Sequence, residues 1–166
     1  MGNIYLIGFM GTGKSTVGKA LARALNREFK DLDELIEERE KKKIVEIFEE
    51  FGEEYFRKAE TEVVRSISEK KGLIVATGGG VVINEENFNL LKKSGILITL
   101  VASPETIYER VKKSSERPLL NVENPLDTIK KMMFERAYYY IKSDFIVDTT
   151  DKEVDEILSE ICELIK

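Results

Sequence analysis

The sequence IYLI at residues 4–7 runs directly into GFMGTGKS at residues 8–15. The second stretch fits the pattern G-x-x-x-x-G-K-[S/T] at every required position, and a segment of helical period follows it. Its glycines let the backbone curl so that successive N–H groups converge on phosphate oxygens, and the following helix points its positive end at the same place. The stretch therefore predicts a phosphate-binding loop between a buried strand and a helix.

The end of this loop carries the chemical groups that nucleotide binding needs. Lys14 is expected to reach the β and γ phosphates, and Ser15 to supply a hydroxyl to Mg²⁺. The residues that we expect to contact the nucleotide here are Gly11, Thr12, Gly13, Lys14, Ser15 and Thr16. A glycine-rich turn that merely contains a lysine is the alternative, and the flanking strand and helix argue against it.

Apolar segments alternate with segments of helical period along the whole chain. The expected strands are Ile4–Ile7, Glu28–Lys30, Leu73–Ala76, Ile96–Val101 and Phe145–Val147. The expected helices are Lys14–Leu25, Leu35–Lys42, Val45–Lys70 with a break near Gly52, Glu85–Lys92, Pro104–Lys112, Pro125–Ile141 and Lys152–Ile165. Strands rich in Val, Ile and Leu without polar alternation are typical of a parallel sheet buried on both faces. The pattern predicts a three-layer α/β/α fold of the P-loop NTPase class with a five-stranded parallel sheet.

Size and composition limit the classes of function. A chain of 166 residues is expected to form one domain over 1–166, and we expect a monomer. The net charge of −5 argues against a nucleic-acid partner, and no apolar run approaches the roughly 20 residues that cross a bilayer. The single cysteine, Cys162, cannot form an intramolecular disulfide, and the start of the chain lacks a signal-peptide layout. A cytoplasmic setting, away from membranes, is the expectation.

A phosphate-binding loop of this class needs a carboxylate near its metal, commonly at the end of a second buried strand. The strand Leu73–Ala76 ends in Thr77-Gly78-Gly79-Gly80 and offers no acid. Asp31 and Asp33 follow another strand at the same edge of the expected sheet, and strand alternation would place them on one side. The alternative is a helix N-cap with an acid in the first helical turn.

Several further residues favour a small anionic substrate. Gly78–Gly80 presents bare backbone suited to close approach by a hydroxyl or a phosphate, with a tight turn as the alternative. Arg136 has Met and Tyr residues three and four positions away, so its charge lies on a largely apolar helix face. Arg57 precedes Glu60 by one turn, which fits either a surface ion pair or a guanidinium held for a ligand carboxylate.

The segment 112–124 is polar, contains Arg117-Pro118 and has no periodicity. Such a segment is typical of an active-site lid or of a plain surface loop. Guanine-binding Asn-Lys-x-Asp and switch Asp-x-x-Gly motifs are absent from the sequence, which argues against a GTPase.

Taken in order, these motifs resemble the shikimate kinases over nearly the whole chain. The matching motifs are Gly8–Thr16, Asp31 with Asp33, Phe56-Arg57 followed by Glu60, Gly78–Gly80, Arg117–Leu120, and Glu135-Arg136 ahead of tyrosines. Each motif alone is modest, whereas the ordered set is highly specific. The chain departs from the family after its last strand, where it reads Asp148–Lys152 in place of the usual Arg and Pro.

The resemblance implies a fold similar to nucleoside monophosphate kinases, with a lid near 112–124 and substrate-binding helices near 33–62. It implies that ATP phosphorylates the 3-hydroxyl of shikimate, in the pathway to chorismate and the aromatic amino acids. The family's pattern places Arg57 and Arg136 on the shikimate carboxylate and Asp33 with Gly78–Gly80 on its hydroxyls. It places Arg110 against adenine and brings Arg117 in from the lid.

Catalysis by this set of residues would be mostly alignment plus fixed positive charge, because phosphoryl transfer spreads negative charge over the transferring group. Lys14, Arg117 and Mg²⁺ would supply that charge, Asp33 would orient the hydroxyl and accept its proton, and Asp31 would bind the metal through water. A kinase for another small acid such as gluconate, and an ATP-binding regulatory module without catalysis, are the alternatives.

Overall fold

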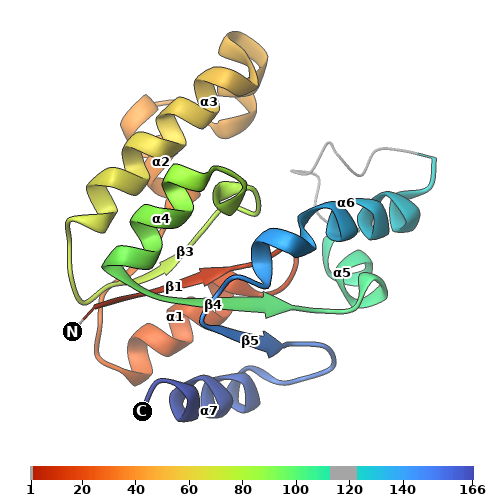
Figure 1. The fold of residues 1–166 in the computed structure, drawn as a ribbon. Coiled ribbons are helices and arrows are strands. Elements are labelled where there is room, and N and C mark those ends of the chain that lie inside the picture. Colours follow the sequence, from red (N-terminus) through yellow and green to blue (C-terminus); the bar gives the residue numbers. More distant parts are fainter. Residues whose placement is uncertain (1, 113–122) are drawn as a thin grey trace.

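A computed structural model describes residues 2–112 and 123–166 of the chain. The chain order of elements is β1 (Asn3–Ile7), α1 (Lys14–Ala24), β2 (Phe29–Asp31), α2 (Leu32–Glu40), α3 (Ile44–Ser68), β3 (Ile74–Ala76), η1 (Val81–Ile83, a 3-10 helix), α4 (Glu85–Ser94), β4 (Gly95–Val101), α5 (Pro104–Val111), α6 (Pro125–Tyr140), β5 (Phe145–Asp148) and α7 (Val154–Leu164) (Figure 1). All five expected strands are present.

The strands form one parallel sheet in the order β2-β3-β1-β4-β5. The chain therefore builds one side of β1 with β2 and β3, and then the other side with β4 and β5. In open α/β sheets of this kind, ligands bind beyond the carboxyl ends of the strands where the order reverses. The phosphate-binding loop leaves the carboxyl end of β1, at that reversal.

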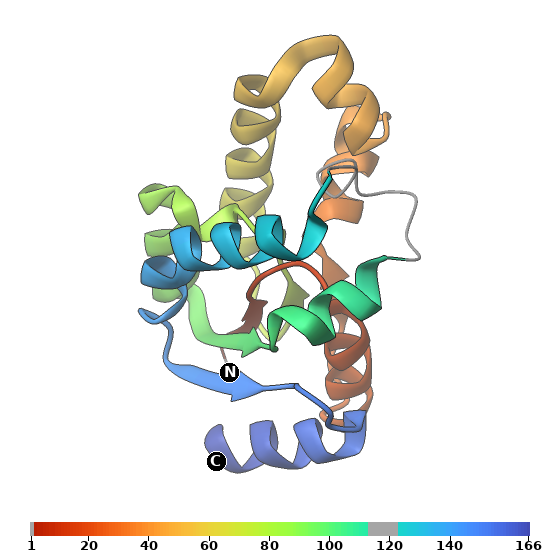
Figure 2. The ribbon, with the colours of Figure 1, turned by 90° about the vertical axis from the view of Figure 1, so that its right-hand side faces the viewer.

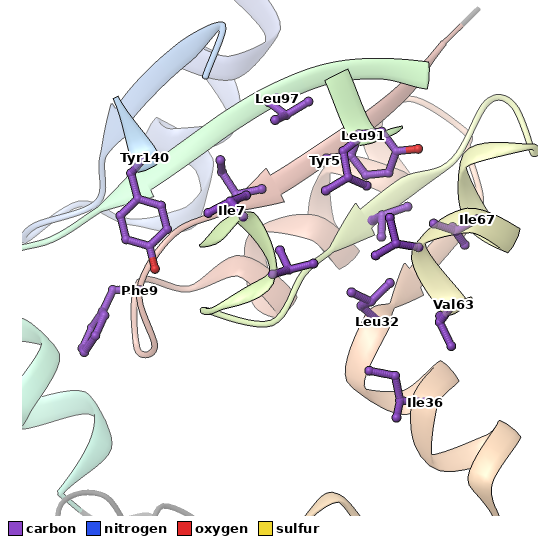
Figure 3. Close-up of a cluster of buried hydrophobic side chains, with 14 of the residues drawn as sticks. Tyr5, Ile7, Phe9, Leu32, Ile36, Val63, Ile67, Leu91, Leu97 and Tyr140 are labelled. Atoms are coloured by element: carbon purple, nitrogen blue, oxygen red, sulfur yellow. The ribbon is translucent and has the colours of Figure 1, made fainter. Parts of the chain in front are cut away.

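Helices cover both faces of the sheet, which confirms the predicted three layers (Figure 2). β1 is buried along its whole length, and its alternate residues enter two separate cores. Tyr5 and Ile7 pack with α3, α4 and α6, as Figure 3 shows for part of this cluster. Ile4 and Leu6 pack on the opposite face with α1 and α7. Burial on both faces explains why the strand sequence lacks polar alternation.

Local differences from the expected helices have clear causes. α2 begins at Leu32, before the expected Leu35, because Asp31 is its N-cap and accepts a hydrogen bond from the Asp33 N–H at 3.0 Å. The break in α3 lies at Gly52, whose φ of 80° is outside the helical region, as the sequence predicted. The short η1 was not predicted, since a single 3-10 turn has no periodic signal.

Asp144 joins the edge strand β5 to β4. Its Oδ2 accepts a hydrogen bond from the Leu97 N–H at 2.8 Å, its own N–H donates to the Leu97 carbonyl oxygen at 2.9 Å, and Lys92 pairs with its carboxylate. Partial burial acts to raise the pKa of Asp144, but the Leu97 N–H and Lys92 outweigh it and hold that pKa below its usual range. The ionised carboxylate therefore stabilises the folded chain.

We expect Asp144→Ala to lower the free energy of unfolding by about 1–3 kcal/mol at pH 7, because the Leu97 N–H loses a charged acceptor. Urea denaturation should show a lower midpoint with an unchanged slope. Because the folded pKa is depressed, the difference from the parent chain should disappear as pH falls through that folded pKa. Glu163→Ala, at an exposed carboxylate on α7, is the control, and an equal loss there would contradict the prediction.

Candidate active site

The phosphate-binding loop joins β1 to α1 through backbone that only glycine tolerates well. Gly8 has a φ of 136°, and a Cβ there would lie 2.2 Å from the Leu100 carbonyl oxygen on β4. Gly13 has a φ of 93° and is the N-cap of α1. Lys14 Nζ donates to the carbonyl oxygens of Gly8 and Phe9, each at 2.9 Å. The lysine charge and the start of α1 therefore meet in one loop, as a triphosphate requires.

Ser15 and Asp31 are in direct contact at the start of α1 and the end of β2. The Ser15 hydroxyl donates to Asp31 Oδ2 at 2.6 Å. The described part of the chain holds no cluster of three or more His, Cys, Asp or Glu side chains that could bind a metal by itself. A hydroxyl and one carboxylate instead fit Mg²⁺, which keeps several waters and binds through few protein ligands plus phosphates.

The predicted reason for pairing Asp31 with Asp33 was wrong, although both residues line one cleft. They do not alternate along a strand, because β2 ends at Asp31 and Asp33 lies in the first turn of α2. The alternative reading, an N-cap followed by a first-turn acid, describes the backbone here. The first turn of α2 brings Asp33 to the triple-glycine segment, where a Cβ on Gly78 would lie 3.1 Å from Asp33 Oδ1.

Arg57 forms an ion pair with a buried carboxylate. Its Nη1 lies 2.9 Å from Glu60 Oε2, and only 1% of the Glu60 side chain is exposed. Burial raises the pKa of Glu60, and the Arg57 charge opposes that rise. A simple surface pair is therefore excluded. The guanidinium also approaches Gly80, where a Cβ would lie 3.0 Å from its two terminal nitrogens.

Arg136 reaches the same segment from the other side. A Cβ on Gly79 would lie 3.4 Å from Arg136 Nη1, and the guanidinium carbon lies 5.5 Å from the centroid of the Phe9 ring. In the described part of the chain, Arg136 forms no ion pair with a carboxylate within 4.0 Å. Its neighbours Met132, Met133 and Tyr139 pack against the core, as the sequence predicted. A charge on an apolar helix face is thus aimed at Gly79.

Arg110 on α5 holds the loop after β5 against the phosphate-binding loop. Its Nη1 donates to the Gly11 carbonyl oxygen and to Thr149 Oγ1, both at 3.1 Å, and its Nη2 donates to the Thr149 carbonyl oxygen at 2.8 Å. Thr149 is buried, and its hydroxyl lies 3.0 Å from the carbonyl oxygens of Thr12 and Val101. These contacts build one wall beside the phosphate-binding loop.

One cleft of about 480 Å³ collects most of the predicted residues. Its lining includes Gly11–Thr16, Asp31, Asp33, Gly78, Gly79 and Arg110, together with Thr149, Lys152, Val154 and Ile157. Arg57, Gly80 and Arg136 are outside that lining and adjoin it through the triple-glycine segment. Arg117 and most of the expected lid, residues 113–122, lie outside the described residues, so their roles stay predictions.

Thr149 and Lys152 are two of the lining residues that the sequence did not predict. They follow β5 directly, in the stretch that departs from the family pattern. A Thr-Thr pair at the carboxyl end of the last strand was the available signal, because that edge of a parallel sheet carries the ligand site.

Comparison with known proteins agrees with this geometry. The family model described as shikimate kinase matches residues 10–166. A shikimate kinase of Thermodesulfovibrio yellowstonii is 47% identical over 161 residues, covering 97% of this chain and 93% of the relative. The structure of shikimate kinase from Acinetobacter baumannii in complex with shikimate is 37% identical, with a TM-score of 0.94 over 99% of this chain and 93% of that one. The Aquifex aeolicus shikimate kinase structure is 45% identical, with a TM-score of 0.87 over 98% and 95%.

Proposed function

Because this chain belongs to the shikimate kinase family of ATP-dependent phosphotransferases, we propose that its cleft aligns ATP with the 3-hydroxyl of shikimate, giving ADP and shikimate 3-phosphate. The observation that carries the proposal is the position of Asp33 and Gly79. Both line the same cleft as Lys14 and Ser15, so an acceptor hydroxyl and a terminal phosphate share one space. In-line transfer needs that shared space and little covalent chemistry from the protein.

The nucleotide side of the proposed site is formed by the phosphate-binding loop and α5. Lys14 neutralises the β and γ phosphates, and the N–H groups at the start of α1 add partial positive charge. Ser15 and Asp31 would hold Mg²⁺, which supplies further positive charge to the phosphate oxygens. Arg110 and Thr149 form the wall on which the adenine would lie.

The acceptor side is formed by α2, α3, α6 and the triple-glycine segment. Asp33 orients the attacking hydroxyl and accepts its proton as the new P–O bond forms. Arg57 and Arg136 bind the shikimate carboxylate, and the Glu60 carboxylate keeps the Arg57 guanidinium beside Gly80. The support from Glu60 is strong because the carboxylate itself is buried.

No helix in the described ranges 2–112 and 123–166 is long and apolar enough to span a membrane. We propose that the chain acts as a monomer, because both sides of the site come from one chain. Size-exclusion chromatography with light scattering measures this directly, and a dimer at micromolar concentration would contradict it.

The test of the proposed function is ADP release by the purified chain with Mg²⁺ and one acceptor at a time. We expect shikimate to be the preferred acceptor, with gluconate and a nucleoside monophosphate at least about 10³-fold slower, since a site built to hydrogen-bond its substrate rejects acceptors that leave its polar groups unpaired. Chelation of Mg²⁺ should abolish turnover. Nuclear magnetic resonance of the product should place the phosphate on the 3-hydroxyl. Equal turnover of gluconate would overturn the acceptor assignment, and binding of ATP without turnover of any acceptor would favour the regulatory module.

A further inference from the structure

The triple-glycine segment is tied to the rest of the fold mainly at its middle residue. The Gly78 and Gly80 carbonyl oxygens accept hydrogen bonds from the N–H groups of Val81 and Ile83, at 3.3 and 3.1 Å, within the local 3-10 turn. The Gly79 carbonyl oxygen instead accepts from the Tyr140 hydroxyl at 2.6 Å, across 61 positions in the sequence. Gly79, which lines the cleft together with Gly78, is therefore held from outside its own loop.

Tyr140 is itself fixed at both ends. It is the last residue of α6 and is 7% exposed, and its ring reaches from the helix towards Phe9 (Figure 3). Its carbonyl oxygen accepts a hydrogen bond from Thr99 Oγ1 on β4 at 2.9 Å, and Thr99 is fully buried. Burial raises the pKa of the Tyr140 phenol although the Arg136 charge opposes it, so the hydroxyl stays a proton donor at neutral pH. The sheet therefore positions the phenol, and the phenol positions Gly79.

Arg136 lies on the same helix, one turn before Tyr140. Both side chains converge on Gly79, the phenol on its carbonyl oxygen and the guanidinium within 3.4 Å of the position of a Cβ. The peptide unit between Gly79 and Gly80 is planar, so fixing its carbonyl oxygen also fixes the direction of the Gly80 N–H. A single hydrogen bond thus sets both the orientation of this peptide and its distance from α6.

We propose that Tyr140 is a positioning residue for the phosphoryl acceptor, which holds Gly79 and the Arg136 helix at the spacing that shikimate bridges. Tyr140 lies outside the cleft lining, and it acts through the Gly79 backbone and the neighbouring Arg136 guanidinium. The inference rests on the proposed function, because it assigns Gly79 and Arg136 to the acceptor side. A purely structural role for the phenol would lower the stability of the fold without changing acceptor affinity selectively.

The test variant is Tyr140→Phe, which removes the hydroxyl and keeps the buried ring. We expect the KM for shikimate to rise about tenfold, the size of one lost hydrogen bond, while the KM for ATP changes less than about twofold. Calorimetric titration of shikimate without nucleotide should show the same loss of affinity. The matched control is Tyr138→Phe, which removes the same hydroxyl from an exposed ring on the same helix and should leave every constant unchanged.

An unchanged shikimate KM in folded Tyr140→Phe would overturn the inference, and so would an equal rise in both KM values.

Thr99→Val provides a second measurement if Tyr140→Phe does not fold. It removes the hydrogen bond to the Tyr140 carbonyl oxygen and should raise the shikimate KM in the same direction by about two- to fivefold; no rise would contradict the inference. Turnover of shikimate by the parent chain distinguishes the two proposals. If the parent chain does not phosphorylate shikimate, the proposed function is wrong. If the parent chain turns over normally and Tyr140→Phe is unaffected, only the positioning role is wrong.

Discussion

Asp33→Asn is expected to lower turnover of shikimate by about 10²- to 10⁴-fold, the usual contribution of a positioned proton acceptor. The amide keeps the shape of the carboxylate but cannot accept the hydroxyl proton. The Asp31 cap of α2 should be kept, because Asp33 contacts it through its backbone N–H. ATP affinity should stay within about twofold, since Lys14 and Ser15 are unaltered.

Single-turnover kinetics with saturating ATP measure this loss directly, because they separate phosphoryl transfer from product release. The control is Glu34→Gln, which neutralises the next acid residue on α2, exposed to solvent and outside the cleft lining. Glu34→Gln should turn over like the parent chain. Turnover of Asp33→Asn within about threefold of the parent would remove the assigned role of Asp33.

Arg136→Ala is expected to weaken shikimate binding by about 10²-fold, with little change in ATP affinity. Removing one partner of a hydrogen-bonded charge pair costs about 2–5 kcal/mol, which corresponds to a loss of affinity of about 30-fold to 4,000-fold. Arg136 should matter more than a surface cation because it faces Gly79 and the Phe9 ring, whereas the Arg57 charge already meets Glu60 and Glu53. A ligand carboxylate is therefore the natural partner of Arg136.

The measurement is calorimetric titration of shikimate and of its carboxamide, which lacks the negative charge. The parent chain should prefer shikimate strongly, and Arg136→Ala should bind the two ligands with nearly equal affinity. Lys131→Ala, at an exposed cation on the same helix, should retain the preference of the parent chain. If Arg136→Ala still discriminated fully between acid and amide, the guanidinium would not be the group that recognises the carboxylate.

The sequence predicted the parts of the fold that depend on local pattern. Residues 4–15 carry an apolar strand and a glycine motif whose physical demands are nearly unique, and the inner strands β1, β3 and β4 follow from apolar runs buried on both faces. The sequence predicted that Asp31 and Asp33 lie together, but for the wrong reason. Strand alternation does not relate them, because β2 ends at Asp31 and Asp31 is the N-cap of α2.

Features that depend on tertiary contacts could not be predicted. Thr149 joins the site only because the loop after β5 packs against Thr12, 137 positions earlier. The sequence could not show that Glu60 is buried. Helical spacing indicates that Arg57 and Glu60 are neighbours, but it does not indicate how exposed the Glu60 side chain is. The bond from Tyr140 to Gly79 likewise joins two segments that no periodic pattern relates.

The order of the strands around β1 places the proposed acceptor side of the cleft mainly on one continuous stretch of the chain. Residues 33–80 carry Asp33, Arg57 and the glycines of the proposed acceptor side. The proposed donor side comes from the phosphate-binding loop and Asp31 before them, and from Arg110, Thr149 and Lys152 after them. Arg136 is the exception that crosses over. Substitutions in residues 33–80 and in α6 could therefore change the acceptor of such a kinase during evolution, while the residues that bind ATP stayed unaltered.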